Sequence, residues 1–236
     1  DKLNLTYHVD EFKYNDSLSF NDLYFTTIGG NNDLVSEFSW DQETPNASTI
    51  KWETYAKDVD HFNFLIQPSY FSIKERKWEI TDASNFKIKA DTIQVEKFLL
   101  KRNDQSIKLW GQISKQDNDQ LNYDIKNLQL DEISEFVTDA VNLEGELISY
   151  GYIANPNENL QHSGTTLIRG FFVDEQEVGD VYLTSIWNQP NKAINLKGDL
   201  MYKGLKNFNL EGQYYTDRET ENLDFELTFD KTDIKF

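Results

Sequence analysis

Hydrophobic and polar residues alternate along most of the chain, which is the pattern of β-strands with one apolar and one polar face. The apolar positions of the clearest runs are Phe62, Phe64 and Ile66; Phe86, Ile88 and Ala90; Ile107, Leu109 and Ile113; Leu121, Tyr123 and Ile125; Val181 and Leu183; Ile194, Leu196 and Leu200; Phe208, Leu210 and Tyr214; Leu223, Phe225, Leu227 and Phe229. Polar turn clusters separate these runs, at residues 102–106, 116–120, 188–192 and 216–222. Strands joined by such short turns pair as antiparallel hairpins.

One segment departs from this period. Its apolar residues recur at three- and four-residue spacing: Leu130, Ile133, Phe136, Val137 and Ala140. Asp131 is a suitable N-cap, because its side-chain oxygen can accept from a free backbone N–H. We therefore expect one short amphipathic helix near residues 131–140, placed to cap an apolar edge of the sheet.

The apolar face of each predicted strand must be covered by a second sheet or by curling of the sheet around itself. The expected fold is all-β, an elongated antiparallel sheet curled into a taco or open sandwich with an apolar interior. The residues expected to line this interior are Phe62, Phe64, Ile66, Ile88, Leu109, Leu183, Ile194, Leu196, Leu210, Leu223, Phe225 and Leu227. An open groove and a closed core share this alternation, so the sequence leaves both readings open.

A loose internal repeat indicates duplicated β units. Residues 35–52 and 181–197 each contain a strand ending in Trp, an Asp/Asn-Gln pair, a turn with Pro and a strand restarting at Ile. We expect an N-terminal β-repeat unit over residues 1–80 and a second over residues 81–236, continuous with the first. Because Asp1 already lies in strand-like sequence, we expect the chain to be a fragment of a longer protein.

Composition supports a folded β protein. Aromatic residues make up 14 % of the chain, and aromatic side chains suit a half-buried pleated surface. The formal charge of −18 repels nucleic-acid phosphates, so we expect no nucleic-acid partner. The same charge keeps a β-rich chain soluble and its strand edges unpaired.

Residues with catalytic or metal-binding spacing are not found in the sequence. His8, His61 and His162 are isolated from one another, and the chain has no cysteine. No nucleotide-binding or nucleophile motif occurs, and no pair of carboxylates stands out among the many acidic residues. We expect neither an enzyme nor a bound cofactor or metal.

The five tryptophans, Trp40, Trp52, Trp78, Trp110 and Trp187, are the remaining candidates for recognition. Exposed and coplanar, they would form a platform for sugar rings; packed on the sheet, they would only stabilise it. The alternative functions are accordingly a carbohydrate-binding module or a structural spacer of an extracytoplasmic protein, the latter binding partners through open strand edges.

The chain resembles the C-terminal β-repeat region of TamB-type translocation and assembly proteins in the AsmA-like family. The resemblance runs from about residue 86 to residue 236 and depends on VNLEGELISYGYIANP (residues 141–156), EVGDVYL (177–183) and SIWNQPNKAINLKGDL (185–200). PSYFSIKERKWEI (68–80) is similar but looser. The asparagine- and lysine-rich composition resembles versions from Bacteroidetes-type bacteria. The family's membrane anchor and its extreme C-terminal region have no counterpart here.

The resemblance implies a function for the apolar face. It implies a periplasmic segment of a bridge-like protein, anchored at the inner membrane in its full-length form and implicated in phospholipid transport to the outer membrane and in the assembly of that membrane. The implied partners are phospholipid acyl chains and an Omp85-type outer-membrane assembly protein. Acyl chains would lie in the groove, where each buried methylene contributes about 0.8 kcal/mol.

Overall fold

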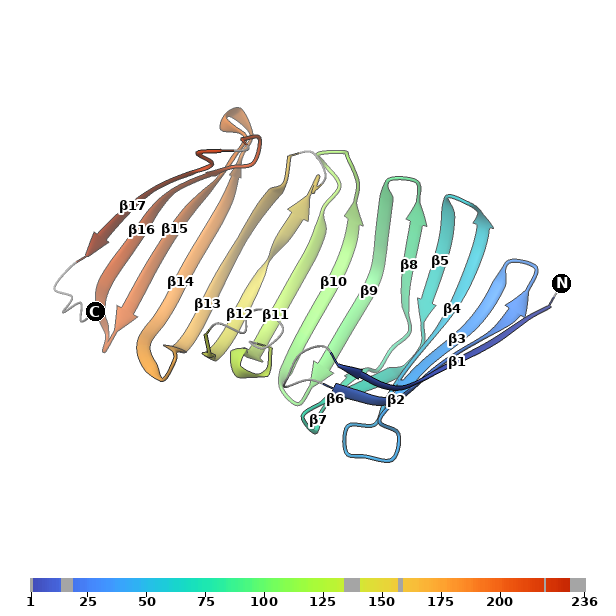
Figure 1. Cartoon of the computed structure of the whole chain (residues 1–236). Coiled ribbons are helices and arrows are strands. Elements are labelled where there is room, and N and C mark those ends of the chain that lie inside the picture. The colour runs from blue at the N-terminus through green and yellow to red at the C-terminus, as the bar shows by residue number, and fades with distance from the viewer. Residues whose placement is uncertain (1, 14–18, 134–140, 157–158, 219, 230–236) are drawn as a thin grey trace. The chain divides into compact units, whose positions relative to one another are not determined.

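The computed structural model describes residues 2–13, 19–133, 141–156, 159–218 and 220–229 (Figure 1). These residues form seventeen β-strands and two short 3-10 helices, and the registers of the strand pairs are antiparallel. The predicted all-β antiparallel fold is therefore confirmed. The chain falls into two compact units, Asp1–Gln112 and Ile113–Phe236, called unit 1 and unit 2. The expected division into repeat units over residues 1–80 and 81–236 is a different one and stays a prediction.

Unit 1 contains the first ten strands. They are β1 (Lys2–Lys13), β2 (Ser19–Gly30), β3 (Asp33–Trp40), β4 (Ser48–Asp58), β5 (His61–Ile66), β6 (Ser69–Ile73), β7 (Arg76–Ile80), β8 (Ser84–Lys89), β9 (Thr92–Arg102) and β10 (Gln105–Ile113), the last of which ends one residue beyond the unit. Strands β1 to β4 pair in chain order. Beyond β4 the sheet divides. One end of β4 pairs with β5, which pairs with β8, and the other end of β4 pairs with β6, which pairs with β7.

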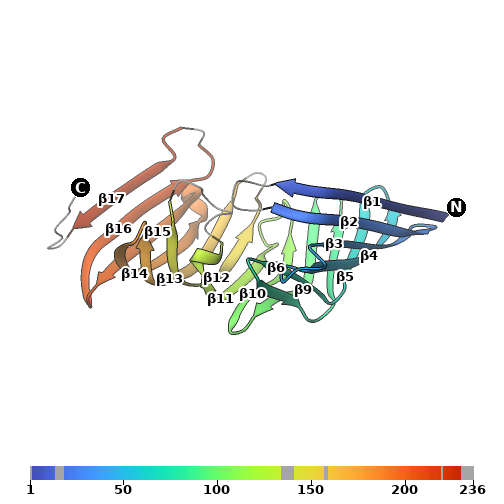
Figure 2. The same cartoon turned by 60° about the horizontal axis from the view of Figure 1, so that its bottom comes forward.

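A break at Pro68 explains this arrangement. Ile66 pairs with Ser84 and Ser69 pairs with Ile80, so β5 with β6 and β8 with β7 form one long hairpin interrupted in both arms. Proline has no N–H to donate to a neighbouring strand, and a sheet tolerates it only at such an interruption. Figures 1 and 2 show the sheet of unit 1 curled, with β1 and β2 turned out of the plane of β5, β8 and β9.

Unit 2 is a meander. Its strands are β11 (Leu121–Gln129), β12 (Leu143–Ala154), β13 (Gln161–Val173), β14 (Gln176–Asn188), β15 (Ala193–Tyr202), β16 (Leu205–Tyr215) and β17 (Leu223–Phe229). Each of these strands pairs with the next one in the chain, from β11 with β12 to β16 with β17, and Figure 2 shows them side by side in this order. The expected hairpins with short polar turns are thus present.

Several hairpins use two consecutive residues with positive φ. Asn31 and Asn32 join β2 to β3, and Lys203 and Gly204 join β15 to β16. Two such residues make the turn whose twist matches that of the flanking strands. Asparagine and glycine tolerate this conformation, which is why polar clusters in the sequence located the turns.

The predicted helix near residues 131–140 lies mostly outside the described residues. What the structure describes is the 3-10 helix η1 (Leu130–Glu132), which follows β11 and buries Leu130. Asp131 lies within η1 and Gln129 precedes it as the capping residue, without a side-chain hydrogen bond. The second 3-10 helix, η2 (Gln189–Asn191), connects β14 to β15 and is capped by Asn188.

Few apolar side chains are fully buried. Among the described residues they are Trp40, Trp78, Ile80, Val95, Leu128, Leu130, Ala154, Ala193 and Ile194. More polar than apolar residues are buried, and most of these are serine or threonine on strands. The apolar face of the strands is therefore covered only in part.

Candidate functional site

The twelve residues predicted to line an apolar interior divide between the two units. Unit 1 holds Phe62, Phe64 and Ile66 on β5, Ile88 on β8 and Leu109 on β10. Unit 2 holds Leu183 on β14, Ile194 and Leu196 on β15, Leu210 on β16, and Leu223, Phe225 and Leu227 on β17. All twelve lie on strands, as the alternation predicted.

In unit 1 the register places the β5 and β8 residues on one face. Phe62 is directly opposite Ile88, and Phe64 is opposite Phe86. Ile66 is opposite Trp52 of β4 and so shares this face. The rings of Phe62 and Phe64 lie 6.2 Å apart and nearly parallel. Leu109 is half-buried on β10.

In unit 2 all seven residues share one face. One row across the sheet runs through Leu183, Gly198, Leu210 and Leu227, each opposite the next. A Cβ added at Gly198 would lie 3.4 Å from side-chain atoms of both Leu183 and Leu210. The next row on this face holds Ser185, Leu196, Gly212 and Phe225, and the one beyond holds Trp187, Ile194, Tyr214 and Leu223. The structure thus brings together these seven predicted residues.

The exposure of the twelve predicted residues shows how far the apolar face of each unit is covered. Only Ile194 of the twelve is buried, whereas Leu223 and Leu227 on β17 are 60 % and 51 % exposed. The others are half-buried, apart from Phe225, which is 36 % exposed. Side chains with this much exposed apolar area are not packed in a closed core.

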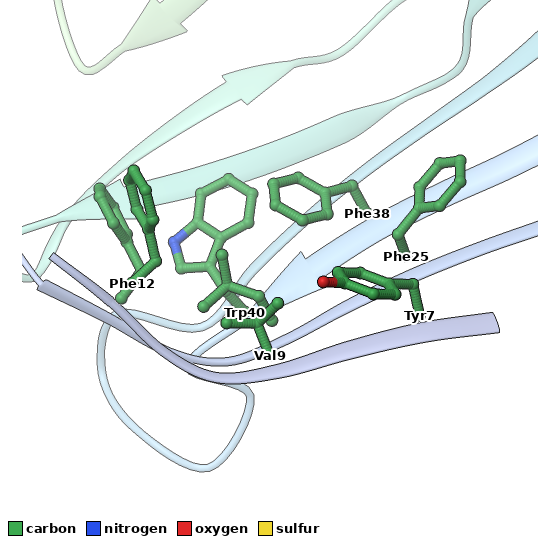
Figure 3. Close-up of a pocket in the computed structure, with 8 residues that line it drawn as sticks. Tyr7, Val9, Phe12, Phe25, Phe38 and Trp40 are labelled. Carbon is green, nitrogen blue, oxygen red and sulfur yellow. The ribbon is translucent and has the colours of Figure 1, made fainter. Parts of the chain in front are cut away.

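A pocket on the same face of unit 1 was not predicted. It has a volume of about 430 Å³, and its lining is apolar or aromatic: Tyr7, Val9 and Phe12 from β1, Phe20, Leu23 and Phe25 from β2, Phe38 and Trp40 from β3 (Figure 3). Tyr7 is opposite Phe25, and Phe25 is opposite Phe38. The sequence carries a signal for it, since Tyr7 and Val9, Leu23 and Phe25, and Phe38 and Trp40 each follow the two-residue period of a strand.

Aromatic contacts surround Trp40 in the wall of this pocket. The Trp40 indole meets Phe20 edge to face at 6.0 Å and lies 5.2 Å from Phe38. Its Nε1–H is buried and has no hydrogen-bond partner among the described residues, and Figure 3 shows the nitrogen on the side of Phe12. Such a donor next to ring faces is stabilised only weakly by N–H···π contact. The pocket wall is therefore aromatic, with one unused donor.

A hydrogen-bonded chain crosses the apolar face of unit 2. The hydroxyl of Tyr123 on β11 lies 2.8 Å from His162 Nε2, and the hydroxyl of Ser185 on β14 lies 2.8 Å from His162 Nδ1. The phenol and imidazole rings are nearly parallel, with an interplanar angle of 6°. Burial lowers the pKa of His162 below its ordinary value, so the imidazole is neutral at neutral pH. We call Tyr123, His162 and Ser185 the polar island.

Two glycines make room for the polar island. Gly151 of β12 and Gly164 of β13 are directly opposite each other. A Cβ at either would lie within 2.8 Å of the Tyr123 hydroxyl. The phenol can therefore extend from β11 across β12 to His162 only because both positions lack a side chain. Sequence reasoning treated His162 as an isolated histidine, because its partners lie 39 and 23 residues away in the chain.

The five tryptophans have different environments. Trp40 and Trp78 are buried, while Trp52 stacks on Phe25 at 6.0 Å. Trp110 lies under the Lys108 ammonium group, and the Trp187 indole donates to Gln189. The buried tryptophans pack on the sheet and are not part of an exposed platform.

Neither a metal-binding cluster nor a membrane-spanning helix is found in the described ranges. No group of three or more His, Asp or Glu residues there is arranged to hold a metal ion. Nor is any described helix long and apolar enough to cross a membrane.

The chain matches no protein-family model, no curated protein and no solved structure. Fold and site together define a class: an all-β protein whose antiparallel sheets each leave an apolar face partly uncovered.

Proposed function

We propose that this chain is a lipid-binding segment that holds the acyl chains of phospholipids on its apolar faces. In full, the proposal is a periplasmic groove segment of a bridge-like, TamB-type protein in a Gram-negative envelope, anchored at the inner membrane. Its role would be phospholipid transport to the outer membrane and assembly of that membrane, together with an Omp85-type protein. The resemblance of residues 86–236 to that family supports these wider parts.

One observation carries the proposal: apolar side chains line one face of each sheet and remain partly exposed there. In unit 2 this face includes Leu196, Leu223, Phe225 and Leu227. In unit 1 it includes a pocket of about 430 Å³ with eight apolar or aromatic residues in its lining. A contiguous exposed apolar surface on a water-soluble protein is a binding surface.

Energetics favour a flexible apolar ligand. An acyl chain that covers ten methylenes on such a face gains about 8 kcal/mol before the cost of ordering it, which offsets a substantial part of that gain. The binding requires no specific headgroup contact. The charge of −18 disfavours anionic headgroups, so zwitterionic lipids are the expected cargo.

The test is lipid retention. The protein is purified from a Gram-negative host without detergent, and bound lipid is extracted and identified by mass spectrometry. Phe225→Asp and Leu196→Asp place a carboxylate on the apolar face of unit 2, and we expect each to lower the amount of bound phospholipid several-fold. Phe225 is the more informative position, because it is partly exposed and its replacement disturbs packing less.

Thr184→Asp is the matched control. Thr184 is exposed, lies on the opposite face of β14 and is paired with Lys197, so the same charge is added where no lipid is expected. Circular dichroism and urea unfolding establish that each variant is folded. Absence of phospholipid from the folded wild-type protein, or equal retention by Phe225→Asp and Thr184→Asp, would contradict the proposal.

A further inference from the structure

The polar island lies on a face whose other side chains are apolar, apart from a neighbouring pair, Ser149 and Thr166, whose hydroxyls are hydrogen-bonded to each other at 2.7 Å. Tyr123 and Ser185 lie in the row that continues through Leu196 and Phe225, and His162 lies on the same face in the adjacent row, opposite Ile153. The residues that the register places on this face include no Asp, Glu, Lys or Arg among those described. The ion pairs of unit 2, such as Lys197 with Glu211, lie on the opposite face.

The hydrogens of the island can be arranged in two ways. In the first, Tyr123 donates to Nε2, Nδ1–H donates to Ser185, and the serine hydroxyl donates to the Gly164 carbonyl oxygen at 3.4 Å. In the second, Ser185 donates to Nδ1 and Nε2–H donates to the Tyr123 oxygen. The phenolic hydrogen of Tyr123 is then free, and no further partner for it exists among the described residues. A neutral imidazole permits both arrangements, because it carries one N–H.

Tyr123 is placed to present that free hydrogen on the face itself. Its hydroxyl lies where the Cβ atoms of Gly151 and Gly164 would stand, which is the direction in which side chains leave the sheet. The residue is half-buried, and the apolar side chains of Leu121 and Ile125 flank it on the same face of β11. In the second arrangement this donor lacks a partner, and partly buried surroundings favour an uncharged acceptor, because a charged one would lose its hydration at greater cost.

We propose that the polar island binds the ester carbonyl of an acylglycerol lipid, with the Tyr123 hydroxyl donating to the carbonyl oxygen while the acyl chain lies along the flanking leucines. This inference rests on the proposed function and deepens it. An ester group is neutral, accepts hydrogen bonds and is bonded directly to an acyl chain, so it suits one donor without charge inside an apolar surface. His162 and Ser185 are positioning residues, since they set the direction of the phenolic hydrogen.

The experiment compares an ester with an ether. Short-chain diester phosphatidylcholine and its diether counterpart have the same headgroup and chain length, but the ether lacks the carbonyl. Binding of each to the full chain is measured by calorimetry below the micelle concentration. We expect the wild-type protein to bind the diester about fivefold more tightly, the effect of one hydrogen bond. Tyr123→Phe should remove this preference and leave the affinity for the diether unchanged.

Tyr214→Phe is the matched control, because Tyr214 is half-buried on the same face in the row of Ile194. It should keep the ester preference. Equal binding of the two lipids by the wild-type protein, or an ester preference that survives in Tyr123→Phe, overturns the inference and leaves the proposed function standing. Failure of both lipids to bind overturns both.

Discussion

Single residues on the apolar face of unit 2 differ in how much room they leave for a methyl group. Gly164 has the Tyr123 hydroxyl 2.7 Å and the Tyr150 carbonyl oxygen 2.8 Å from the position of an added Cβ. At Gly198 the nearest atoms are 3.4 Å away and belong to leucine side chains. The first glycine is therefore required by its neighbours, whereas the second has room for alanine.

Gly164→Ala should lower the free energy of unfolding by about 1–3 kcal/mol, because the phenol or the backbone must move. Gly198→Ala should have little effect or stabilise slightly, since alanine restricts the unfolded chain more than glycine. Urea unfolding at neutral pH measures both differences. Equal losses in the two variants would show that the glycines are needed for strand conformation and not for the position of Tyr123.

The sequence predicted which face of a strand a residue lies on, but it did not predict contacts between individual residues of different strands. Alternation placed Leu183, Leu196 and Leu210 on one side of the sheet, because the side-chain period of a strand is two whatever its partners are. It could not connect Tyr123 to His162, since their contact depends on the register of three strands and on a pair of glycines in between. The pocket at Trp40 likewise requires the curvature of β1 to β3, which no local pattern specifies.

Strands differ in how many neighbouring strands they are hydrogen-bonded to. β13 is hydrogen-bonded on both sides, to β12 and β14, and most of its residues are half-buried. β17 pairs with β16, and its other side has no partner among the described residues. All seven of its residues are exposed. Local opening therefore costs β17 much less than β13.

Hydrogen–deuterium exchange followed by mass spectrometry should report this difference. Peptides covering β17 are expected to exchange much faster than peptides covering β13 under native conditions, because exchange follows the free energy of local opening. If β17 instead exchanged as slowly as β13, the free edge of β17 would have to be covered in solution.

Strands and turns were largely predictable, and their exceptions have local causes. The polar clusters at residues 102–106 and 116–120 marked in advance the turns that join β9 to β10 and β10 to β11. The interruption at Pro68 was not predicted, because proline at that point is equally consistent with a turn between separate strands. Of the predicted helix, only its first residues fall within the described part, as η1.

At the scale of the whole molecule, charge opposes the compact state. The chain carries 41 acidic and 23 basic residues, so the net repulsion is only partly offset by the exposed ion pairs found on the strands. Exposed ion pairs contribute little to stability, whereas the excess of 18 negative charges acts on every part of the chain.

Raising the salt concentration from about 20 to 200 mM should therefore increase the melting temperature, because the Debye length shortens to less than about 10 Å and screens this repulsion. Thermal unfolding followed by circular dichroism in sodium chloride is the measurement. A fall in melting temperature over this range would mean that the attractive ion pairs outweigh the excess charge.

The meander of unit 2 has a consequence for how cooperative its unfolding is. Since the strand pairs from β11–β12 to β16–β17 each join strands that are consecutive in the chain, the free energy of folding accumulates from nearest-neighbour terms, as in a one-dimensional array. An array of this kind melts inward from its weakest end and tolerates the gain or loss of a whole hairpin. Length is thus a property that this architecture can vary while the chemistry of each strand stays the same.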